Sequence, residues 1–307
     1  MQLKMQSTAK PIKPTEPTTP TKPPTLSSAL SPTDRDDTDL LACDCHFHVF
    51  NAGESVPGAR YLPSYTSTLA GWQVCAARAQ VERGVVVQPS FLGTDNRLLL
   101  ATLAQRPDHL RGVAVVSESV SASDLLNLYA NGVRGIRLNL AGDTDDLRVM
   151  RALPASFWSA LIAAQLHLEL HSDIGRVAAL LPQVPSAITV VLDHFGKPEL
   201  ASIADDTVVA VRQRKRAGGD TYITLSGAYR LGVDDSHAQK KFSNELAALW
   251  RDELGRERLL WGSDWPCTRH ESEANYAALR VGLDHWLPDA DDKRAALQSN
   301  PQRLYWR

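Results

Sequence analysis

Short apolar runs alternate with amphipathic stretches along most of the chain. Each run is rich in β-branched residues and ends at polar or turn-forming residues, which is typical of strands in a parallel sheet that helices cover. The eight runs are Leu41–His46, Val85–Gln88, Gly112–Val116, Val133–Leu138, Leu166–His171, Ile188–Asp193, Tyr222–Leu225 and Leu259–Ser263. The pattern therefore predicts eight strands with helices between them.

The stretches between these runs carry apolar residues at spacings of three and four, as expected for helices that bury one face. Residues 96–106 and 242–254 show this spacing, and Gly255 is placed to end the second helix. Eight strand–helix units predict an α/β fold of the (β/α)₈ TIM-barrel type. A single barrel commonly fills a chain of this length, so one folded domain is expected over residues 39–307.

Residues 1–38 differ from the rest of the chain in composition. They contain seven of the 18 prolines and no aromatic residue, in a mixture rich in Thr, Lys and Ser. Such a segment buries too little apolar surface to offset the entropy lost on ordering, which predicts a disordered Pro/Thr-rich arm. A plain tail is the simpler interpretation, and docking of the arm in an aromatic groove of a partner is the alternative.

Composition limits the classes of partner. The chain is 43% hydrophobic and 22% charged, with a formal net charge of −2, so it has no excess of positive charge to attract nucleic acid or an anionic membrane. No apolar run approaches the ~18 residues of a membrane span and no signal peptide is recognisable, which predicts a cytoplasmic protein. These features do not fix the oligomeric state, and a homo-oligomer stays an open alternative.

The four cysteines show neither a CxxC pair nor the spacing of a zinc finger, so reduced thiols are expected. Cys43 and Cys45 alternate with His46 and His48 along the first predicted strand. Because successive side chains of a strand point to opposite faces, the two thiols are predicted to face the outer helices. The two imidazoles are predicted to project together to the other face.

Polar residues follow almost every predicted strand. In a (β/α)₈ barrel the catalytic groups lie at the C-terminal ends of the strands, so these residues are predicted to surround one pocket. They are His46, His48, Gln88, Ser90, Arg137, Asn139, His171, Asp193, His194, Ser226 and Asp264. Four of the nine histidines fall at these positions, which indicates a functional constellation rather than isolated buried histidines.

His46, His48, His171, His194 and Asp264 offer imidazoles and a carboxylate, a donor set that suits Zn²⁺. A metal bound by three or four such groups lowers the pKa of its water and polarises a carbonyl, and Asp264 would take the proton from the attacking water. Without a metal, the imidazoles can donate hydrogen bonds to the developing oxyanion. The residues alone leave both versions open.

Two arginines are candidates for contact with a substrate. Arg137 shares strand parity with Val133 and Gly135, which places its guanidinium inside the predicted barrel, where it can bind a carboxylate bidentately. Arg230 follows the seventh predicted strand and is expected to meet a second anionic or hydroxylated group. For both arginines the alternative is an internal salt bridge.

Ser90 and Tyr229 are placed near the same strand ends and are predicted to donate hydrogen bonds to the substrate. Polar residues are common at such positions, so Ser90 and Tyr229 do not change the reaction that the other residues predict.

Four segments together resemble the amidohydrolase superfamily. They are Asp44–His48, Val191–Pro198, Leu225–Arg230 and Leu260–Pro266, and they occur in this order. Within the superfamily the chain is similar to the lactonase group, which includes pyrone-dicarboxylate and sugar-acid lactonases. The resemblance extends from about residue 39 to the Asn300–Tyr305 ending.

This resemblance implies hydrolysis of a small carboxylated lactone. It places His46, His48 and His194 around the ester carbonyl, with Asp264 as the general base. It also implies that two arginines, Arg137 and Arg230, hold a substrate carboxylate.

The resemblance also bears on the metal. His171 stands where mononuclear members carry a ligand, so His46, His48, His171 and Asp264 are expected to hold one Zn²⁺ or Mn²⁺ if a metal is bound. Members that work without a metal also exist. No lysine ends the fourth predicted strand, so a two-metal centre is not expected.

Two positions depart from the pattern of the pyrone-dicarboxylate enzyme. Residues 139–143 lack a second arginine, and His171 stands where that pattern has a tyrosine. The resemblance therefore leaves the identity of the lactone open. A nonoxidative decarboxylase of the same superfamily is one alternative, and a barrel that binds without catalysis is another.

Overall fold

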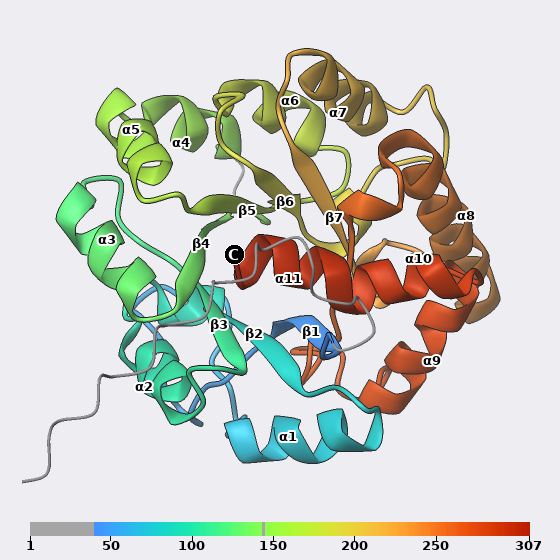
Figure 1. The fold of residues 1–307 in the computed structure, drawn as a ribbon, viewed down its shortest axis with the longest axis horizontal. Coiled ribbons are helices and arrows are strands. Elements are labelled where there is room, and N and C mark those ends of the chain that lie inside the picture. Colours follow the sequence, from blue (N-terminus) through green and yellow to red (C-terminus); the bar gives the residue numbers. More distant parts are fainter. Residues whose placement is uncertain (1–39, 143–144) are drawn as a thin grey trace, which may run out of the picture. The chain divides into compact units, whose positions relative to one another are not determined.

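The structure, a computed structural model, describes residues 40–142 and 145–307. The arm predicted over residues 1–38 lies outside the described residues. Eight strands form one sheet in the order β1 to β8, and each neighbouring pair is parallel (Figure 1). They are β1 (Cys43–Phe47), β2 (Arg83–Val87), β3 (Leu110–Ala114), β4 (Val133–Asn139), β5 (His167–His171), β6 (Val190–Leu192), β7 (Thr221–Leu225) and β8 (Leu259–Trp261). The predicted (β/α)₈ fold and its eight strands are confirmed.

Hydrogen bonds join the segment after β8 to β1, so the sheet returns to its first strand. The Asp264 amide donates to the His46 carbonyl at 2.8 Å. The buried Asp44 carboxylate accepts from the amide and the hydroxyl of Ser263 at 2.8 and 2.6 Å. We call this junction between β1 and residues 262–265 the seam.

Helices surround the sheet (Figure 1). They are α1 (Leu69–Arg78), α2 (Arg97–Gln105), α3 (Ala122–Ala130), α4 (Asp146–Ala152), α5 (Ala155–Ala163), α6 (Val177–Leu180), α7 (Asp206–Arg216), α8 (Ser236–Leu254), α9 (Tyr276–Trp286), α10 (Ala290–Arg294) and α11 (Asn300–Tyr305). The helices predicted over residues 96–106 and 242–254 correspond to α2 and α8. Gly255 follows α8 with a φ of 83°, a conformation that favours glycine. Within residues 40–142 and 145–307, no helix has the length and apolar character needed to cross a membrane.

The last helix covers one end of the barrel. In Figure 1, α11 lies across the centre of the ring of strands, and its Leu304 and Tyr305 pack with Val85 and Val191 in the barrel interior. The Tyr305 ring lies 5.3 Å from that of His167, the first residue of β5. Since the strands begin at this end, their C-terminal ends are left for a functional site.

The predicted orientation of Cys43 and Cys45 is wrong. Both thiols pack in the interior of the barrel, whereas Asp44 points outward and accepts a hydrogen bond from the Trp72 indole of α1 at 2.9 Å. The pairing of β1 with β2 shifts register after Asp44. This irregularity breaks the two-residue alternation of the strand, so Cys45 and His46 both face the interior.

Candidate active site

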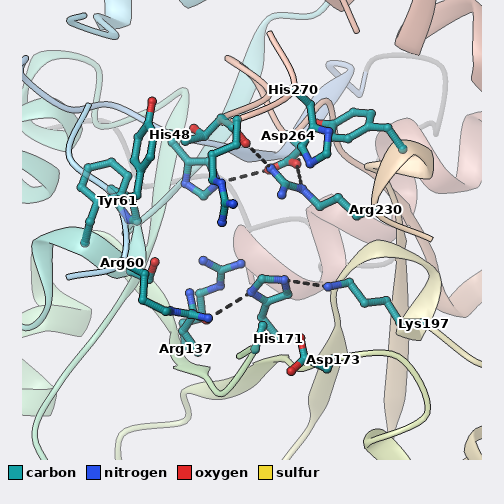
Figure 2. A pocket seen from close by; sticks show the side chains of 18 of the residues that line it. His48, Arg60, Tyr61, Arg137, His171, Asp173, Lys197, Arg230, Asp264 and His270 are labelled. Atoms are coloured by element: carbon teal, nitrogen blue, oxygen red, sulfur yellow. Dashed lines mark hydrogen bonds and ion pairs between the residues drawn. The ribbon is translucent and has the colours of Figure 1, made fainter. Parts of the chain in front are cut away.

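A pocket of about 470 Å³ opens where the strands end (Figure 2). The predicted site residues that line it are His48, Ser90, Arg137, His171, Tyr229, Arg230 and Asp264. His46 and His194 are buried beside them, with ring centroids 5.3 Å apart. The structure therefore brings side chains from both ends of the chain to one end of the barrel.

Asp264 follows β8 and is held by three side chains. Its Oδ2 accepts hydrogen bonds from the Tyr229 hydroxyl at 2.8 Å and from Arg230 Nε at 2.6 Å. Its Oδ1 lies 3.2 Å from His48 Nε2. Burial raises the pKa of Asp264, but the charge of Arg230 acts against burial, and the pKa is held well below its ordinary value. Asp264 is thus an ionised carboxylate at neutral pH.

The two ring nitrogens of His48 have different surroundings. Nδ1 lies 2.8 Å from the Val87 carbonyl and donates to it, because a carbonyl only accepts. Burial lowers the pKa of His48, so the neutral ring presents a lone pair at Nε2. That lone pair faces the carboxylate of Asp264. Two acceptors without a proton between them repel each other, so a cation bound by both would stabilise this contact.

His46 has the opposite character. Its ring lies 5.0 Å from that of His48, and neither ring nitrogen has a hydrogen-bond partner within the described part of the chain. Nδ1 lies 3.4 Å from Asp193 and Nε2 lies 3.7 Å from Asp264. Burial lowers the pKa of His46, but the carboxylate of Asp193 outweighs this effect, and the pKa is raised.

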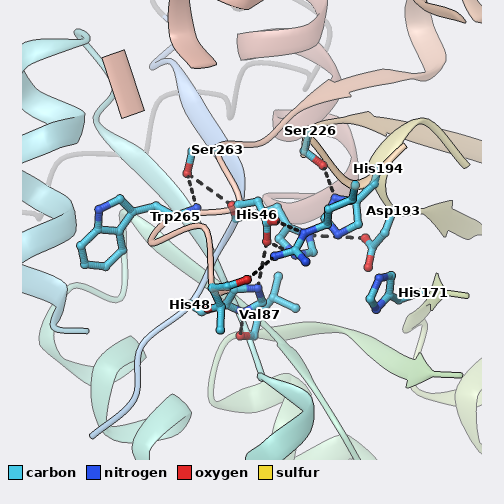
Figure 3. Close-up of polar contacts among 12 residues, drawn as sticks. His46, His48, Val87, His171, Asp193, His194, Ser226, Ser263 and Trp265 are labelled. Carbon is cyan, nitrogen blue, oxygen red and sulfur yellow. Dashed lines mark hydrogen bonds and ion pairs between the residues drawn. The ribbon is translucent and has the colours of Figure 1, made fainter. Parts of the chain in front are cut away.

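Two groups of residues have ligand atoms close enough for one metal ion. His46, His48 and Asp264 form the first group, and His46, Asp193 and His194 form the second, with all ligand atoms of a group within 4.8 Å of one another. Figure 3 shows His46, His48, Asp193 and His194 together. The first group fits a divalent cation best, because it contains the unpartnered His46 Nε2 and the facing acceptors of His48 and Asp264. His171 belongs to neither group, so the predicted ligand set is only partly assembled.

His194 begins a segment with unusual backbone geometry. The four residues from His194 to Lys197 all have positive φ, between 46° and 70°. His194 Nδ1 lies 2.9 Å from the Ser226 hydroxyl (Figure 3). Burial lowers the pKa of His194 well below its ordinary value, so the ring is neutral at neutral pH.

Arg137 points into the barrel, as its strand parity predicts, but it meets carboxylates of the protein. Its Nε and Nη2 lie 3.2 and 2.7 Å from Asp193 Oδ2, and Nε lies 3.2 Å from Glu169 Oε1. Glu169 was not predicted as a site residue, although its alternation with His171 along β5 was a usable signal. Burial and the charge of Asp193 raise the pKa of Glu169 to about 8. The internal salt bridge, the alternative for Arg137, is present.

Arg230 is likewise paired within the protein. Besides its bond to Asp264, its Nη2 donates to the Thr268 carbonyl at 3.0 Å. Ser90 is exposed at the pocket wall, at the start of a short 3₁₀ helix, Ser90–Leu92. The predicted contacts of Arg230 and Tyr229 with a substrate are therefore contacts with Asp264 in this structure.

His171 and Lys197 form a separate part of the wall. Lys197 Nζ lies 3.0 Å from His171 Nε2 and donates to the Ser172 carbonyl at 3.0 Å. Asn139 Oδ1 lies 3.3 Å from His171 Nδ1. Burial, with the charge of Lys197, lowers the pKa of His171 well below its ordinary value. Burial, with the charge of Arg230, lowers the pKa of Lys197 to about 8.

Several pocket residues were not predicted from the sequence. They are Arg60, Tyr61, Asp173, Lys197, Asp234, Arg269 and His270. Most lie in loops, where no periodic pattern marks them. Lys197 was detectable, because it belongs to the Val191–Pro198 segment that carries His194.

Comparisons with known proteins agree with this geometry. Residues 43–307 match the amidohydrolase family. The chain is similar to 2-pyrone-4,6-dicarboxylate hydrolase of Comamonas testosteroni, with 30% identity over 286 residues, 86% of this chain and 90% of that protein. It is also similar to 4-sulfomuconolactone hydrolase of Rhizobium radiobacter, with 26% identity over 279 residues, 86% of this chain and 89% of that protein.

A solved structure is similar over the same part of the chain. It is the crystal structure of a probable 2-pyrone-4,6-dicarboxylic acid hydrolase from Acinetobacter baumannii with citric acid bound. The TM-score is 0.75 and the identity 31%, and the match covers 87% of this chain and 99% of the other.

Proposed function

The chain belongs to the amidohydrolase family, and from this premise we propose that it opens a small carboxylated lactone by attack of water on the ester carbonyl. Both curated relatives described above are named as hydrolases, and both names state an anionic substrate. Neither name indicates the decarboxylase alternative. The pocket of this chain is lined by several cationic side chains, which agrees with the anionic substrates named for the two relatives.

One observation carries the proposal. An ionised carboxylate, Asp264, presents its Oδ1 to the rings of His46 and His48 at the edge of the pocket, at 3.7 and 3.2 Å. Tyr229 and Arg230 occupy only Oδ2. One carboxylate oxygen is thus fixed in place, while the other is available to accept a proton from water.

The reaction needs one proton transfer in each direction. Asp264 takes a proton from the attacking water as the water oxygen bonds to the carbonyl carbon. The ring C–O bond then breaks, and Asp264 returns the proton to the leaving oxygen. Lactone and water together give a hydroxy acid, and no group of the protein is changed at the end of the cycle.

The histidines are proposed to stabilise the carbonyl oxygen as it becomes negative. With the Ser226 hydroxyl donating to Nδ1, the neutral His194 ring carries its proton on Nε2 and can donate it in a hydrogen bond. When no metal is bound, His46, whose pKa is raised by Asp193, offers positive charge on the same side. Arg137 is proposed to hold Asp193 and Glu169 in place beneath these rings.

We further propose that His46, His48 and Asp264 hold one divalent cation, Zn²⁺ or Mn²⁺. The unpartnered His46 nitrogen and the facing acceptors of the other two residues support this assignment. A bound ion supplies a water of lowered pKa and polarises the carbonyl. It must also displace the proton that the raised pKa of His46 favours, so its binding is expected to weaken at low pH.

The test is a panel of carboxylated five- and six-membered lactones with purified protein, and product identification by mass spectrometry. The expected result is uptake of one water and formation of the hydroxy acid. Release of CO₂ from an unsaturated acid without water uptake would instead establish the decarboxylase alternative. If neither reaction occurs with any member of the panel, the proposed lactone hydrolysis is contradicted and the non-catalytic alternative is favoured.

A parallel arm repeats the panel after treatment with a chelator and after adding back Zn²⁺ or Mn²⁺. Loss of activity with the chelator and recovery with one ion support the metal proposal. Full activity in the chelated protein, with no metal found by elemental analysis, would contradict it and favour catalysis by the imidazoles alone.

A further inference from the structure

Three cations of the pocket wall lack an anionic partner. Within residues 40–142 and 145–307, no carboxylate oxygen forms an ion pair with Lys197, Arg60 or Arg269, although all three line the pocket. By contrast, Arg137 and Arg230 are each paired with carboxylates of the protein. The charges that are available to a ligand are therefore not those of the arginines at the strand ends.

Lys197 is the most informative of the three, because it is only 7% exposed, whereas both arginines are exposed. A buried ammonium group is costly unless an anion accompanies it. Two of its three N–H donors are directed to neutral acceptors, the Ser172 carbonyl and the His171 ring. One donor is left for a group that enters the pocket, while Asp193 and Asp173 act on the ammonium charge without forming an ion pair with it.

The backbone holds Lys197 in this position. The run of positive φ from His194 to Lys197 is sterically unfavourable for residues other than glycine. It carries both His194, beside His46, and Lys197, at the pocket wall, within four residues. The same short segment therefore sets the spacing between the reacting carbonyl and the ammonium group.

Arg60 reaches the pocket from the loop between β1 and α1. Its guanidinium lies against Gly142, where a Cβ would clash with Nη1. In Figure 2, Arg60 and Lys197 lie on either side of His171, and Asp264, His48 and Arg230 lie on the opposite side of the pocket. Lys197 and Arg60 thus share one wall, and the proposed base stands on the other.

We propose that Lys197 and Arg60 form an anion subsite that holds a substrate carboxylate on the wall away from Asp264, and that Lys197 determines the preference for anionic over neutral lactones. This inference rests on the proposed lactone hydrolysis, and it assigns the carboxylate contact to residues other than Arg137 and Arg230.

The experiment compares a carboxylated lactone with the same lactone carrying a carboxamide. Lys197→Met is expected to raise KM for the carboxylated lactone about 10- to 100-fold, as expected for the loss of one charge-assisted hydrogen bond. The KM for the carboxamide should change about two-fold or less. Arg60→Gln, in an exposed loop, should give a smaller loss of the preference for the carboxylated lactone. This variant tests the subsite if Lys197→Met does not fold.

A matched control is Lys241→Met, which removes a lysine from the exposed surface of α8, outside the pocket. This variant should leave KM unchanged for both the carboxylated lactone and the carboxamide. If Lys197→Met lowers kcat/KM for the charged and the neutral lactone by the same factor, the subsite proposal is wrong and Lys197 acts elsewhere in the reaction or in folding.

A binding measurement separates this inference from the proposed function. Propane-1,2,3-tricarboxylate and its neutral triamide are titrated calorimetrically into wild type and both pocket variants. Binding of the tricarboxylate alone, with affinity lost in Lys197→Met, supports the subsite even if no lactone reacts. No binding to wild type, or equal binding to wild type and Lys197→Met, overturns it whether or not lactones are hydrolysed.

Discussion

At the scale of single residues, the state of Asp264 depends on its neighbours. A buried carboxyl group would be neutral, but Arg230 and Tyr229 donate to one of its oxygens and histidines face the other. The same contacts that keep Asp264 ionised also make it a weak base. A substrate that loosens the bond from Arg230 would therefore strengthen the base at the moment it is needed.

Asp264→Asn should lower kcat on the best lactone of the panel by a factor on the order of a hundred or more, because the amide cannot take a proton from water. Asp252→Asn, on the exposed surface of α8, is the control for the loss of one carboxylate and should retain full activity. Steady-state kinetics and circular dichroism of both variants check this. Near wild-type kcat in Asp264→Asn would rule out Asp264 as the base.

Glu169 is predicted to affect the pH dependence of stability. Its pKa of about 8 in the folded chain lies above the ordinary 4.5, so between these values the native state holds a proton that the unfolded chain has released. Stability from this group is present at low pH and is lost as the pH rises through this window. The slope for one proton is at most about 1.4 kcal/mol per pH unit.

Glu169→Gln replaces the protonated acid by a neutral group of the same shape and removes this titration. The free energy of unfolding of the variant should fall less steeply than that of wild type between about pH 5 and pH 8. Urea titrations across this range measure both slopes. Equal slopes would show that Glu169 is ionised in the native protein.

At the scale of elements, the first strand explains most of the difference between the predicted and the observed interior. Strict alternation predicts that Cys45 and His46 face opposite sides, but the register shift turns both inward. Asp44, before the shift, alternates with the two inward cysteines and points outward, where it binds α1 and the seam. Nothing in the local pattern of apolar residues marks this irregularity, since it depends on how β1 pairs with β2.

Asp44→Ala should destabilise the barrel by about 3 kcal/mol or more, because it leaves the buried donors of Ser263 and Trp72 without an acceptor. The comparison is Asp235→Ala, which removes the N-cap of α8 at its exposed end and should cost about 1 kcal/mol. Chemical denaturation of both variants tests this order. Equal losses would mean that Asp44 contributes no more than an ordinary cap.

At the scale of the whole molecule, the barrel brings together residues that are remote in sequence. His48 and Asp264 are 216 positions apart and lie on the two sides of the seam. A cation held by these residues and His46 would therefore connect the first and last strands. Its binding energy would add to the stability of the entire barrel.

Zn²⁺ at a hundredfold excess over its Kd should stabilise chelator-treated protein by ~2.7 kcal/mol, which corresponds to a rise in Tm of roughly 5–10 °C. His48→Ala should abolish the shift, whereas His285→Ala, on α9 outside the candidate site, should keep it. Differential scanning calorimetry measures the effect. An unchanged Tm in the presence of Zn²⁺ would contradict a metal at the seam.

Local features of the sequence predict the eight strand–helix units, because burial of one helix face and of whole strands imposes apolar periods on short segments. They also point to His46, His48, His194 and Asp264, because barrel topology places polar residues that follow strands at one end. The orientation of the thiols and the partners of the charged groups depend instead on how the strands pair in three dimensions. Register shifts and the pairing of opposite charges across the barrel depend on which strands meet, so Arg137 and Arg230 pair with carboxylates of the protein, while Lys197 stays unpaired at the pocket wall.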